Sequence, residues 1–416
     1  MTGTRVADLA ISLPRLCARL DALAEIGPIE NGGNARLALT DEDRAGRDLV
    51  TSWMTDLGLR VEIDEIGNAV GTWPPERTDA PVMTGSHIDT VATGGRFDGS
   101  LGVLAGIEVV ETVIAAGVEL EHPLAVAFFT DEEGSRFAPD MLGSLVFAGG
   151  MPLEDALTVR AIDGKVLGEE LLRIGYAGPQ PCPARPPHAY VELHIEQGPV
   201  LEAEGVDIGV VTGVQGISWT ELTISGQSNH AGTTPMAMRH DAGYAAAAIA
   251  TFVRELAAGL GPPQVATVGR IELQPNLVNV IARRATLTVD LRNTDDTRLA
   301  ESERRLAEFC AELSQHEGVE ISSRSLARFA PVEFDPGVVD LVEEVALARG
   351  CSTKRMPSGA GHDAQMLARV CPAGMVFVPS VNGISHNPAE LTHDDDLEAG
   401  ANVLLHVLVR LATEKR

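Results

Sequence analysis

The sequence predicts an α/β protein with a second, smaller domain inserted into the first. Three observations support this fold class. Apolar strand-like runs alternate with helix-like segments, residues 124–130 are almost continuously apolar, and a block of alternating polarity interrupts the middle of the chain. Continuous apolar runs are typical of strands covered on both faces, whereas alternation indicates a sheet with one open face. A chain of 416 residues is also longer than one hydrophobic core usually serves.

Two helices and several strands are expected in the first 200 residues. Residues 41–58 have helical periodicity and end at a glycine, a common helix stop. Residues 100–116 place apolar side chains on one helical face, and Ser100 is expected to be the N-cap. A period of two or a short apolar run predicts strands within these segments: 59–73, 81–86, 124–130 and 190–195.

The segment 213–327 is the predicted inserted domain. Alternating polarity indicates strands at 218–225, 264–273 and 284–292, and helical periodicity indicates helices at 242–260 and 296–315. The order strand, helix, strand, strand, helix is typical of a small α+β domain. The flanking segments 1–212 and 328–416 then form one discontinuous domain.

The balance of charge argues against two kinds of partner. The 59 acidic and 32 basic residues give a formal net charge of −27. Nucleic acids and anionic membrane surfaces are bound through Lys and Arg, so we expect neither as a partner. The apolar runs are too short to cross a bilayer. Five scattered cysteines without a C-x-x-C pair, and an N-terminus without a signal-peptide pattern, are typical of a reduced cytoplasmic protein.

Histidines and carboxylates gather where the predicted strands end. The side chains concerned are His87, Asp98, Glu132, Glu133, His194 and His386. Open α/β sheets form their ligand crevice at the carboxyl ends of the strands. Imidazoles and carboxylates together suit Zn²⁺, Mn²⁺ or Co²⁺, and one carboxylate can bridge two ions ~3.5–4 Å apart. Of two adjacent acids, one can bind metal while the other takes a proton from metal-bound water.

Each of these residue types also has an ordinary structural role. A single histidine is more often a surface or core residue than a metal ligand, and an acidic run after a strand is usually a solvated turn. What favours a metal site is that all of these side chains occur together at strand ends.

The order of the motifs resembles the amidase/carbamoylase branch of the M20 metallopeptidase-like family. From about residue 20 to 412, the matching segments are GSHIDTV, GGRFDG, FTDEEGSRF, ELHIEQG, NHAGTTPM, NLVNVI, DLRN, SGAGHDA and ISHNPAE. This branch includes N-carbamoyl-L-amino-acid hydrolases, allantoate amidohydrolases and bacterial β-ureidopropionases. The resemblance implies an α/β/α metallohydrolase catalytic domain. It also implies that the inserted block is a lid and dimerisation domain, and hence that the protein is a homodimer.

The resemblance implies two divalent metal ions per subunit, either Zn²⁺, Mn²⁺, Co²⁺ or Ni²⁺. His87 and His194 would hold one ion, and Glu133 and His386 would hold the other. Asp98 would bridge the two ions. All five positions carry the residue type that the family uses.

The resemblance also implies catalytic and substrate-binding roles. Glu132 matches the general base, and Asp89 matches a carboxylate that orients the imidazole of His87. His230 matches a residue that stabilises the oxyanion. The substrate-binding positions implied in this way are Gln197, His230, Asn279, Arg292, Gly359 and Gly361. Arg292 is a natural partner for a substrate carboxylate.

These matches predict hydrolysis of the terminal carbamoyl C–N bond of an N-carbamoyl-L-amino acid by metal-bound water, giving the amino acid, CO₂ and ammonia. Allantoate and N-carbamoyl-β-alanine stay open as other small ureido substrates with a carboxylate. Residues 213–219 (GVQGISW) depart from the A-x-x-G-Q-R-R-Y pattern of allantoate enzymes. An aminopeptidase or deacylase would share every metal ligand, whereas the lid motifs favour ureido substrates. A binding protein without activity is disfavoured by the complete ligand set.

Overall fold

The computed structural model describes residues 6–414, and the chain forms two compact units. The large unit consists of Met1–Gly213 and Glu333–Arg416, and the small unit consists of Val214–Val332. The sequence placed the limits of the inserted block at 213 and 327. The small unit extends further because a strand that the sequence did not predict follows its last helix.

The large unit is built on a nine-stranded sheet in the order β1-β2-β4-β3-β5-β13-β6-β11, with β12 paired to β6. The strands are β1 (Arg60–Ile63), β2 (Ala69–Trp73), β3 (Val82–His87), β4 (Leu124–Phe129), β5 (Ala189–Ile195), β6 (Ile208–Val214), β11 (Val332–Glu333), β12 (Thr353–Ser358) and β13 (Ala373–Val378). The central strands β4, β3, β5 and β13 are parallel, and all of their residues are buried. Their carboxyl ends therefore meet at one edge of the sheet.

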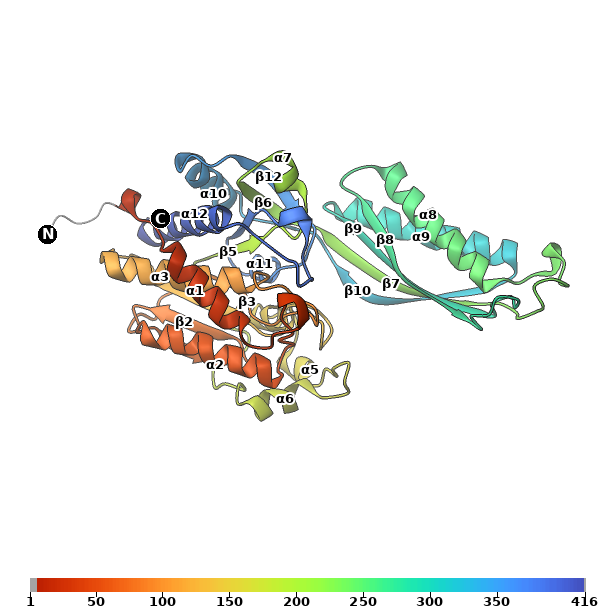
Figure 1. Cartoon of the computed structure of the whole chain (residues 1–416), viewed down its shortest axis with the longest axis horizontal. Coiled ribbons are helices and arrows are strands. Elements are labelled where there is room, and N and C mark those ends of the chain that lie inside the picture. Colours follow the sequence, from red (N-terminus) through yellow and green to blue (C-terminus); the bar gives the residue numbers. More distant parts are fainter. Residues whose placement is uncertain (1–5, 415–416) are drawn as a thin grey trace. The chain divides into compact units, whose positions relative to one another are not determined.

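Helices cover both faces of this sheet, which makes the large unit a three-layer α/β/α structure (Figure 1). One face packs against α2 (Asp41–Asp56), α3 (Ser100–Ala116), α10 (Pro336–Ala348) and α12 (Asp394–Thr413), and α1 (Leu13–Ala24) packs on α3. The other face packs against α4 (Leu142–Phe147) and α11 (Asp363–Leu367). The remaining elements of this unit are short: α5 (Leu153–Leu157), α6 (Leu167–Ile174), α7 (Val200–Glu204) and the 3₁₀ turns Val6–Asp8, Glu30–Gly32 and Val381–Gly383.

The start of α3 differs from the prediction that Ser100 is its N-cap. Gly99 occupies the cap position with φ of 61°, and Ser100 is already the first helical residue. A Cβ on Gly99 would lie 2.5 Å from ring atoms of His87. The chain needs glycine here because its main chain runs directly against that imidazole.

The small unit is an antiparallel four-stranded sheet in the order β10-β7-β9-β8, packed against two helices. Its elements are β7 (Gly216–Ser225), α8 (Ala242–Leu260), β8 (Val265–Gln274), β9 (Arg284–Asn293), α9 (Asp296–Glu317), β10 (Glu320–Phe329) and the 3₁₀ turn Met236–Met238. The side chains of Asp241 and Asp295 cap the two helices. The strand β10 escaped prediction because it is an edge strand whose side chains are mostly exposed and polar.

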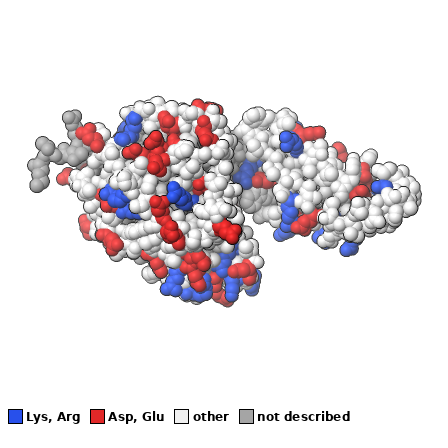
Figure 2. All heavy atoms as spheres, in the orientation of Figure 1, with Lys and Arg blue, Asp and Glu red and all other residues white. Residues whose placement is uncertain are grey.

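The surface carries both signs of charge. On the face drawn in Figure 2, acidic side chains are spread over both units, with Lys and Arg placed among them. Within residues 6–414, no helix has the length and apolar character that a membrane span requires.

Candidate metal centre

Four neighbouring parallel strands bring the candidate ligands to one edge of the large unit. His87 is the last residue of β3, and His194 is the last but one of β5. Glu132 and Glu133 follow β4, and His386 follows β13 after a 3₁₀ turn. Because these strands are parallel and adjacent in the order β4-β3-β5-β13, the residues at their ends become neighbours.

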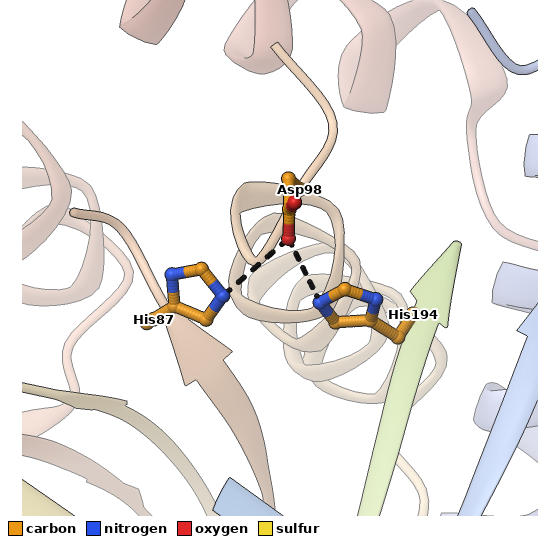
Figure 3. Close-up of side chains that lie close together, drawn as sticks. All are labelled: His87, Asp98 and His194. Atoms are coloured by element: carbon orange, nitrogen blue, oxygen red, sulfur yellow. Dashed lines mark ion pairs between the residues drawn. The ribbon is translucent and has the colours of Figure 1, made fainter. Parts of the chain in front are cut away.

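Asp98, just before α3, lies between two groups of these side chains. Its Oδ1 atom is 3.6 Å from Nε2 of His87 and 3.2 Å from Nε2 of His194 (Figure 3). Its Oδ2 atom is 3.3 Å from Nε2 of His386, which is also 3.3 Å from Oε2 of Glu133. Each oxygen of one carboxylate thus faces its own set of donors, and both sets are compact enough to hold a metal ion.

The orientation of the imidazoles fits metal ions at these positions. Nδ1 of His87 donates to the carbonyl oxygen of Asp89, and Nδ1 of His194 donates to that of Ile195, both at 2.9 Å. In this tautomer Nε2 carries a lone pair, and at His194 it accepts the N–H of Gly99 at 3.2 Å. Lone pairs that face carboxylate oxygens require a cation between them. The nitrogen and oxygen donors fit two divalent ions.

Without such ions, protons take the place of the cations. The hydrogen bond with Asp98 raises the pKa of His386 to about 9, and Glu133 contributes to this shift. Burial raises the pKa of Glu133 to about 8, with a further contribution from the charge of Asp98. Burial also raises the pKa of Glu132 well above its usual range, although His87 opposes the shift. The ligand shell therefore binds positive charge, either as protons or as metal.

The side chain of Asp89 does not lie where a carboxylate that orients the imidazole of His87 is expected. The main-chain carbonyl of Asp89 orients His87, while its carboxylate lies 3.9 Å from Nδ1 of that ring. The carboxylate oxygens instead face the main-chain N–H groups of Glu132 and Glu133 at 3.3 and 3.4 Å. The turn after β3 brings the carbonyl closer to the ring, and the side chain links this turn to the acidic pair after β4.

Three residues around the centre have left-handed backbone conformations, which are unusual outside glycine. They are Asp131 with φ of 56°, Gln197 with φ of 57° and His386 with φ of 55°. Asp131 immediately precedes the acidic pair, and His386 is itself a candidate ligand. Strain of this kind is concentrated at functional sites.

Gln197 contacts the carboxylate between the two donor sets. Its Nε2 atom lies 2.8 Å from Oδ2 of Asp98 and 3.3 Å from Oγ of Ser385. Sequence reasoning named Gln197 only as a substrate-binding residue and did not single out Ser385 or Glu390. Ser385 Oγ lies 3.0 Å from Asp98 Oδ2, and Glu390 accepts the N–H of Asp98. Ser385 and Glu390 could have been identified from their position in the ISHNPAE segment, which also contains His386.

The loop that holds Gly359 and Gly361 lies between β12 and α11 of the same unit. Gly359 is exposed and Gly361 is partly buried. Ser358 closes this loop, since its Oγ accepts the N–H of Ala360 and lies 2.9 Å from Nε2 of His362. The ring of His362 in turn packs on that of His194, with centroids 4.5 Å apart.

The remaining candidates belong to the small unit. His230 and Asn279 lie on adjacent loops, joined by a bridge between His230 and Val280 and by a hydrogen bond from Ala231 N–H to the Asn279 carbonyl. Arg292 lies near the other end of the sheet, in β9 opposite Ile217. The structure thus pairs His230 with Asn279 and separates both from Arg292.

Arg292 is held by its own neighbours within the small unit. Its Nη2 atom lies 2.8 Å from Oδ2 of Asp290, and its guanidinium lies 5.9 Å from the ring centroid of Trp219. The pair is partly exposed, with 22% and 28% of the two side chains accessible. Arg292 is therefore oriented but still partly open to solvent.

Comparison with known proteins places this geometry in a family. Residues 83–410 match the sequence profile of peptidase family M20/M25/M40. The chain belongs to this family. The M20 chain is 44% identical to an N-carbamoyl-L-amino-acid amidohydrolase of Rhizobium meliloti, over 97% of either protein. It is 42% identical to a protein of that name from Geobacillus stearothermophilus, over 96% of this chain and 98% of the relative. An allantoate amidohydrolase of Escherichia coli (strain K12) is 36% identical over 94% and 96%.

Solved structures agree with this family assignment. A hydantoinase/carbamoylase family amidase from Burkholderia multivorans superimposes on the M20 chain with a TM-score of 0.92 and 47% identity, over 98% of this chain and 100% of the other. A dinuclear metal binding peptidase of family M20 from Bacillus subtilis shares the fold, with a TM-score of 0.64 and 14% identity over 96% and 98% of the chains. The predicted α/β/α architecture and the family resemblance are both confirmed.

Proposed function

We propose that this protein is a metal-dependent amidohydrolase that removes the carbamoyl group from N-carbamoyl-L-amino acids. The observation that carries the hydrolytic function is the position of Asp98, whose two oxygens face two separate sets of donors. The names of the relatives at 44% and 42% identity support the substrate class. The reaction adds water across the C–N bond between the carbamoyl carbon and the amino-acid nitrogen and yields the amino acid and carbamate, which decays to CO₂ and ammonia.

The large unit would supply the metal ligands and the base. His87 and His194 would hold one divalent ion, Glu133 and His386 the other, and Asp98 would bridge them. Two such ions would lower the pKa of water and polarise the ureido carbonyl. Zn²⁺, Mn²⁺, Co²⁺ and Ni²⁺ all suit these ligands.

Glu132 would act as general base and then as general acid. Its Oε2 atom is 3.3 Å from Nε2 of His87, so its carboxylate borders the ligand cluster. It is largely buried, and burial raises the pKa of its carboxyl group, which makes the carboxylate a stronger proton acceptor. In this role it takes a proton from the attacking water and delivers it to the leaving nitrogen.

His230 has the tautomer that an oxyanion donor needs. Its Nδ1 atom accepts the N–H groups of Gly232 at 3.1 Å and Thr233 at 3.3 Å. The proton of the neutral ring must therefore reside on Nε2, which is free to donate a hydrogen bond to an oxygen that gains negative charge. Arg292 and Asn279, with Gln197 and the N–H groups of Gly359 and Gly361, would bind the polar groups of the substrate.

Arg292 and the pair His230–Asn279 of one chain are too far apart to bind the same small substrate. Arg292 and Arg284, the first residue of β9, are eight residues apart, which is about 26 Å in an extended strand. Asn279 lies in the loop between β8 and β9, which the bond from Arg283 N–H to the carbonyl of Gln274 closes at the Arg284 end. His230 is bridged to Val280 in the same loop, so both residues lie beyond the Arg284 end of β9. A carbamoyl amino acid is far shorter than this distance. We therefore propose that either Arg292 or the pair His230–Asn279 serves the site of a partner copy.

The edge strand β8 supports a homodimer through the small unit. This ten-residue strand is at the edge of the four-stranded sheet, and Val265 and Ile271 on it are 50% and 47% exposed. Long unprotected edges of this kind invite pairing with another strand. A second copy could pair its own β8 there.

For the location of the protein in the cell we propose the cytoplasm, since all five cysteines are free thiols.

Ammonia release from a panel of substrates tests the proposed function. Metal-free protein is reconstituted with Mn²⁺, Co²⁺ or Zn²⁺ and given N-carbamoyl-L-methionine, its D-isomer, N-carbamoyl-β-alanine, allantoate and a dipeptide, the last followed by amine release. Preferred turnover of the L-carbamoyl compound supports the proposal. Preferred turnover of allantoate or N-carbamoyl-β-alanine would change the substrate and keep the chemistry. Cleavage of the dipeptide alone would contradict the proposal.

A further inference from the structure

Glu390 is a buried carboxylate that is attached to the main chain of Asp98. Its Oε1 atom accepts the N–H of Phe97 at 3.0 Å and the N–H of Asp98 at 3.1 Å. Its Oε2 atom lies 3.0 Å from Oγ of Ser385, the residue before His386. Only 6% of Glu390 is exposed. Burying a carboxylate is costly unless donors surround it, and here three donors do so.

The turn that carries Asp98 is shaped to receive this carboxylate. A Cβ on Gly95 would lie 2.2 Å from Oε1 of Glu390 and 2.4 Å from its Cβ and Cδ atoms. Any residue other than glycine at position 95 would therefore displace Glu390 from the two N–H groups. The GGRFDG and ISHNPAE segments, far apart in the sequence, fit together at this contact.

Glu390 touches the ligand shell at two places without joining it. Within residues 6–414, it is in none of the side-chain groups that could hold a metal ion. Ser385 Oγ is 3.0 Å from both Glu390 Oε2 and Asp98 Oδ2, so this hydroxyl lies between the two carboxylates and can donate its proton to either. Glu390 thus binds the main chain of Asp98, the residue whose carboxylate faces both donor sets, and also binds Ser385 in the segment that carries His386.

We propose that Glu390 is a positioning residue of the metal centre, which fixes Asp98 between the two ions and ties it to the segment of His386. This inference rests on the proposed dinuclear centre. Residues that orient metal ligands in this way typically contribute 10- to 100-fold to metal affinity. A carboxylate that only stabilised the turn would affect folding and leave metal binding unchanged.

The test is the affinity of metal-free protein for Mn²⁺, measured by calorimetry in the absence of substrate. We expect Glu390→Ala to bind Mn²⁺ about 10- to 100-fold more weakly than the wild type. Glu390→Gln keeps one oxygen for the two N–H groups and can donate to Ser385, so its affinity should stay near that of the wild type. Gly95→Ala leaves Glu390 in the chain but displaces it, and should weaken binding as Glu390→Ala does.

Asp335→Ala is the matched control. One carboxylate oxygen of Asp335 also accepts two main-chain N–H groups, from Gly337 at 2.9 Å and Val338 at 3.1 Å, in the same unit and at no candidate ligand. It should lower stability without changing Mn²⁺ affinity. The absorption spectrum of the Co²⁺-loaded protein should change in Glu390→Ala and not in Asp335→Ala.

Wild-type affinity in Glu390→Ala, or an equal loss in Asp335→Ala, would overturn the inference. If Glu390→Ala does not fold, Gly95→Ala and Glu390→Gln decide by the same readout. A wild-type protein that binds two ions but releases no ammonia from any ureido substrate would contradict the proposed function alone. A wild type that binds no divalent ion would overturn the inference together with the metal centre.

Discussion

His230 accepts at its Nδ1 atom the main-chain N–H of Gly232, 3.1 Å away. This contact leaves the proton on Nε2 and predicts that the ring acts as a neutral hydrogen-bond donor. We expect His230→Ala to lower kcat about 10²- to 10³-fold, as the loss of one oxyanion donor does, with a smaller effect on KM. Steady-state kinetics with N-carbamoyl-L-methionine measure this. An unchanged kcat would remove His230 from catalysis.

Glu132→Gln should abolish proton transfer while leaving the metal ligands in place. Loss of a positioned general base typically costs about 10²- to 10⁴-fold in rate. The metal content of the variant, measured by elemental analysis after dialysis, should equal that of the wild type. A variant with near-normal rate would show that another group is the base, and a variant without metal would place Glu132 among the ligands.

Mixed dimers test whether two chains form each site. After subunit exchange at equal amounts, half of the dimers contain one chain of each variant. Each of these has one complete site if the second residue serves the site of the partner copy, because both substitutions then fall in the same site. The mixture should then recover about a quarter of the wild-type activity. Glu132→Gln is mixed with His230→Ala in one experiment and with Arg292→Ala in another.

We expect one of the two mixtures to recover activity, because Arg292 lies near one end of β9 and His230 lies on a loop beyond its other end, too far away to share a site within one chain. Recovery in both mixtures or in neither would contradict the proposed exchange. Light scattering of each variant before mixing controls for loss of the dimer.

Metal binding should release protons at neutral pH. The pKa of His386 is about 9 in the protein without metal, so at pH 7 its ring carries a proton that a divalent ion must displace. Affinity for the ion should therefore fall as pH decreases below 9 and should level off above it. Calorimetry at pH 7 in buffers of different ionisation enthalpy measures the protons released. Binding independent of pH between 6.5 and 9 would contradict this expectation.

The large unit also contains a fully buried ion pair whose loss should be costly. Arg47 and Asp43, one turn apart on α2, are 2.7 Å apart with neither side chain exposed. Asp43→Ala leaves the guanidinium without its partner and should lower the free energy of unfolding by roughly 3–5 kcal/mol. Arg44→Ala breaks an exposed pair with Asp48 at the same spacing and should cost less than about 1 kcal/mol. Urea denaturation of the two variants compares them, and equal losses would contradict the prediction.

Local patterns predicted much of the fold. The helices Ser100–Ala116 and Ala242–Leu260 have the bounds that periodicity indicates, and the apolar runs became the parallel central strands. The rule that the carboxyl ends of parallel strands meet at one edge of the sheet also predicted that His87, His194 and Glu133 would lie close together. These features depend on neighbours in sequence or on the general geometry of parallel sheets.

Other features depend on contacts that no local pattern encodes. Gly99 caps α3 because it lies against His87, and the carboxylate of Asp89 turns to Glu132 because a carbonyl already holds the imidazole. The contact between Glu390 and Asp98 joins residues nearly three hundred positions apart. Strand β10 is a polar edge strand without a buried face, so its sequence has no hydrophobic pattern that would predict it.

The left-handed backbone at Asp131, Gln197 and His386 has a consequence for how this protein can change. Each such conformation costs an L-residue roughly 1 kcal/mol, so three together take a substantial part of the 5–15 kcal/mol that typically separates a folded from an unfolded protein. Glycine at these positions would relieve the strain but remove the side chains at the centre. A laboratory selection for heat resistance alone should therefore accumulate substitutions at these positions and yield proteins that are more stable but catalytically inactive.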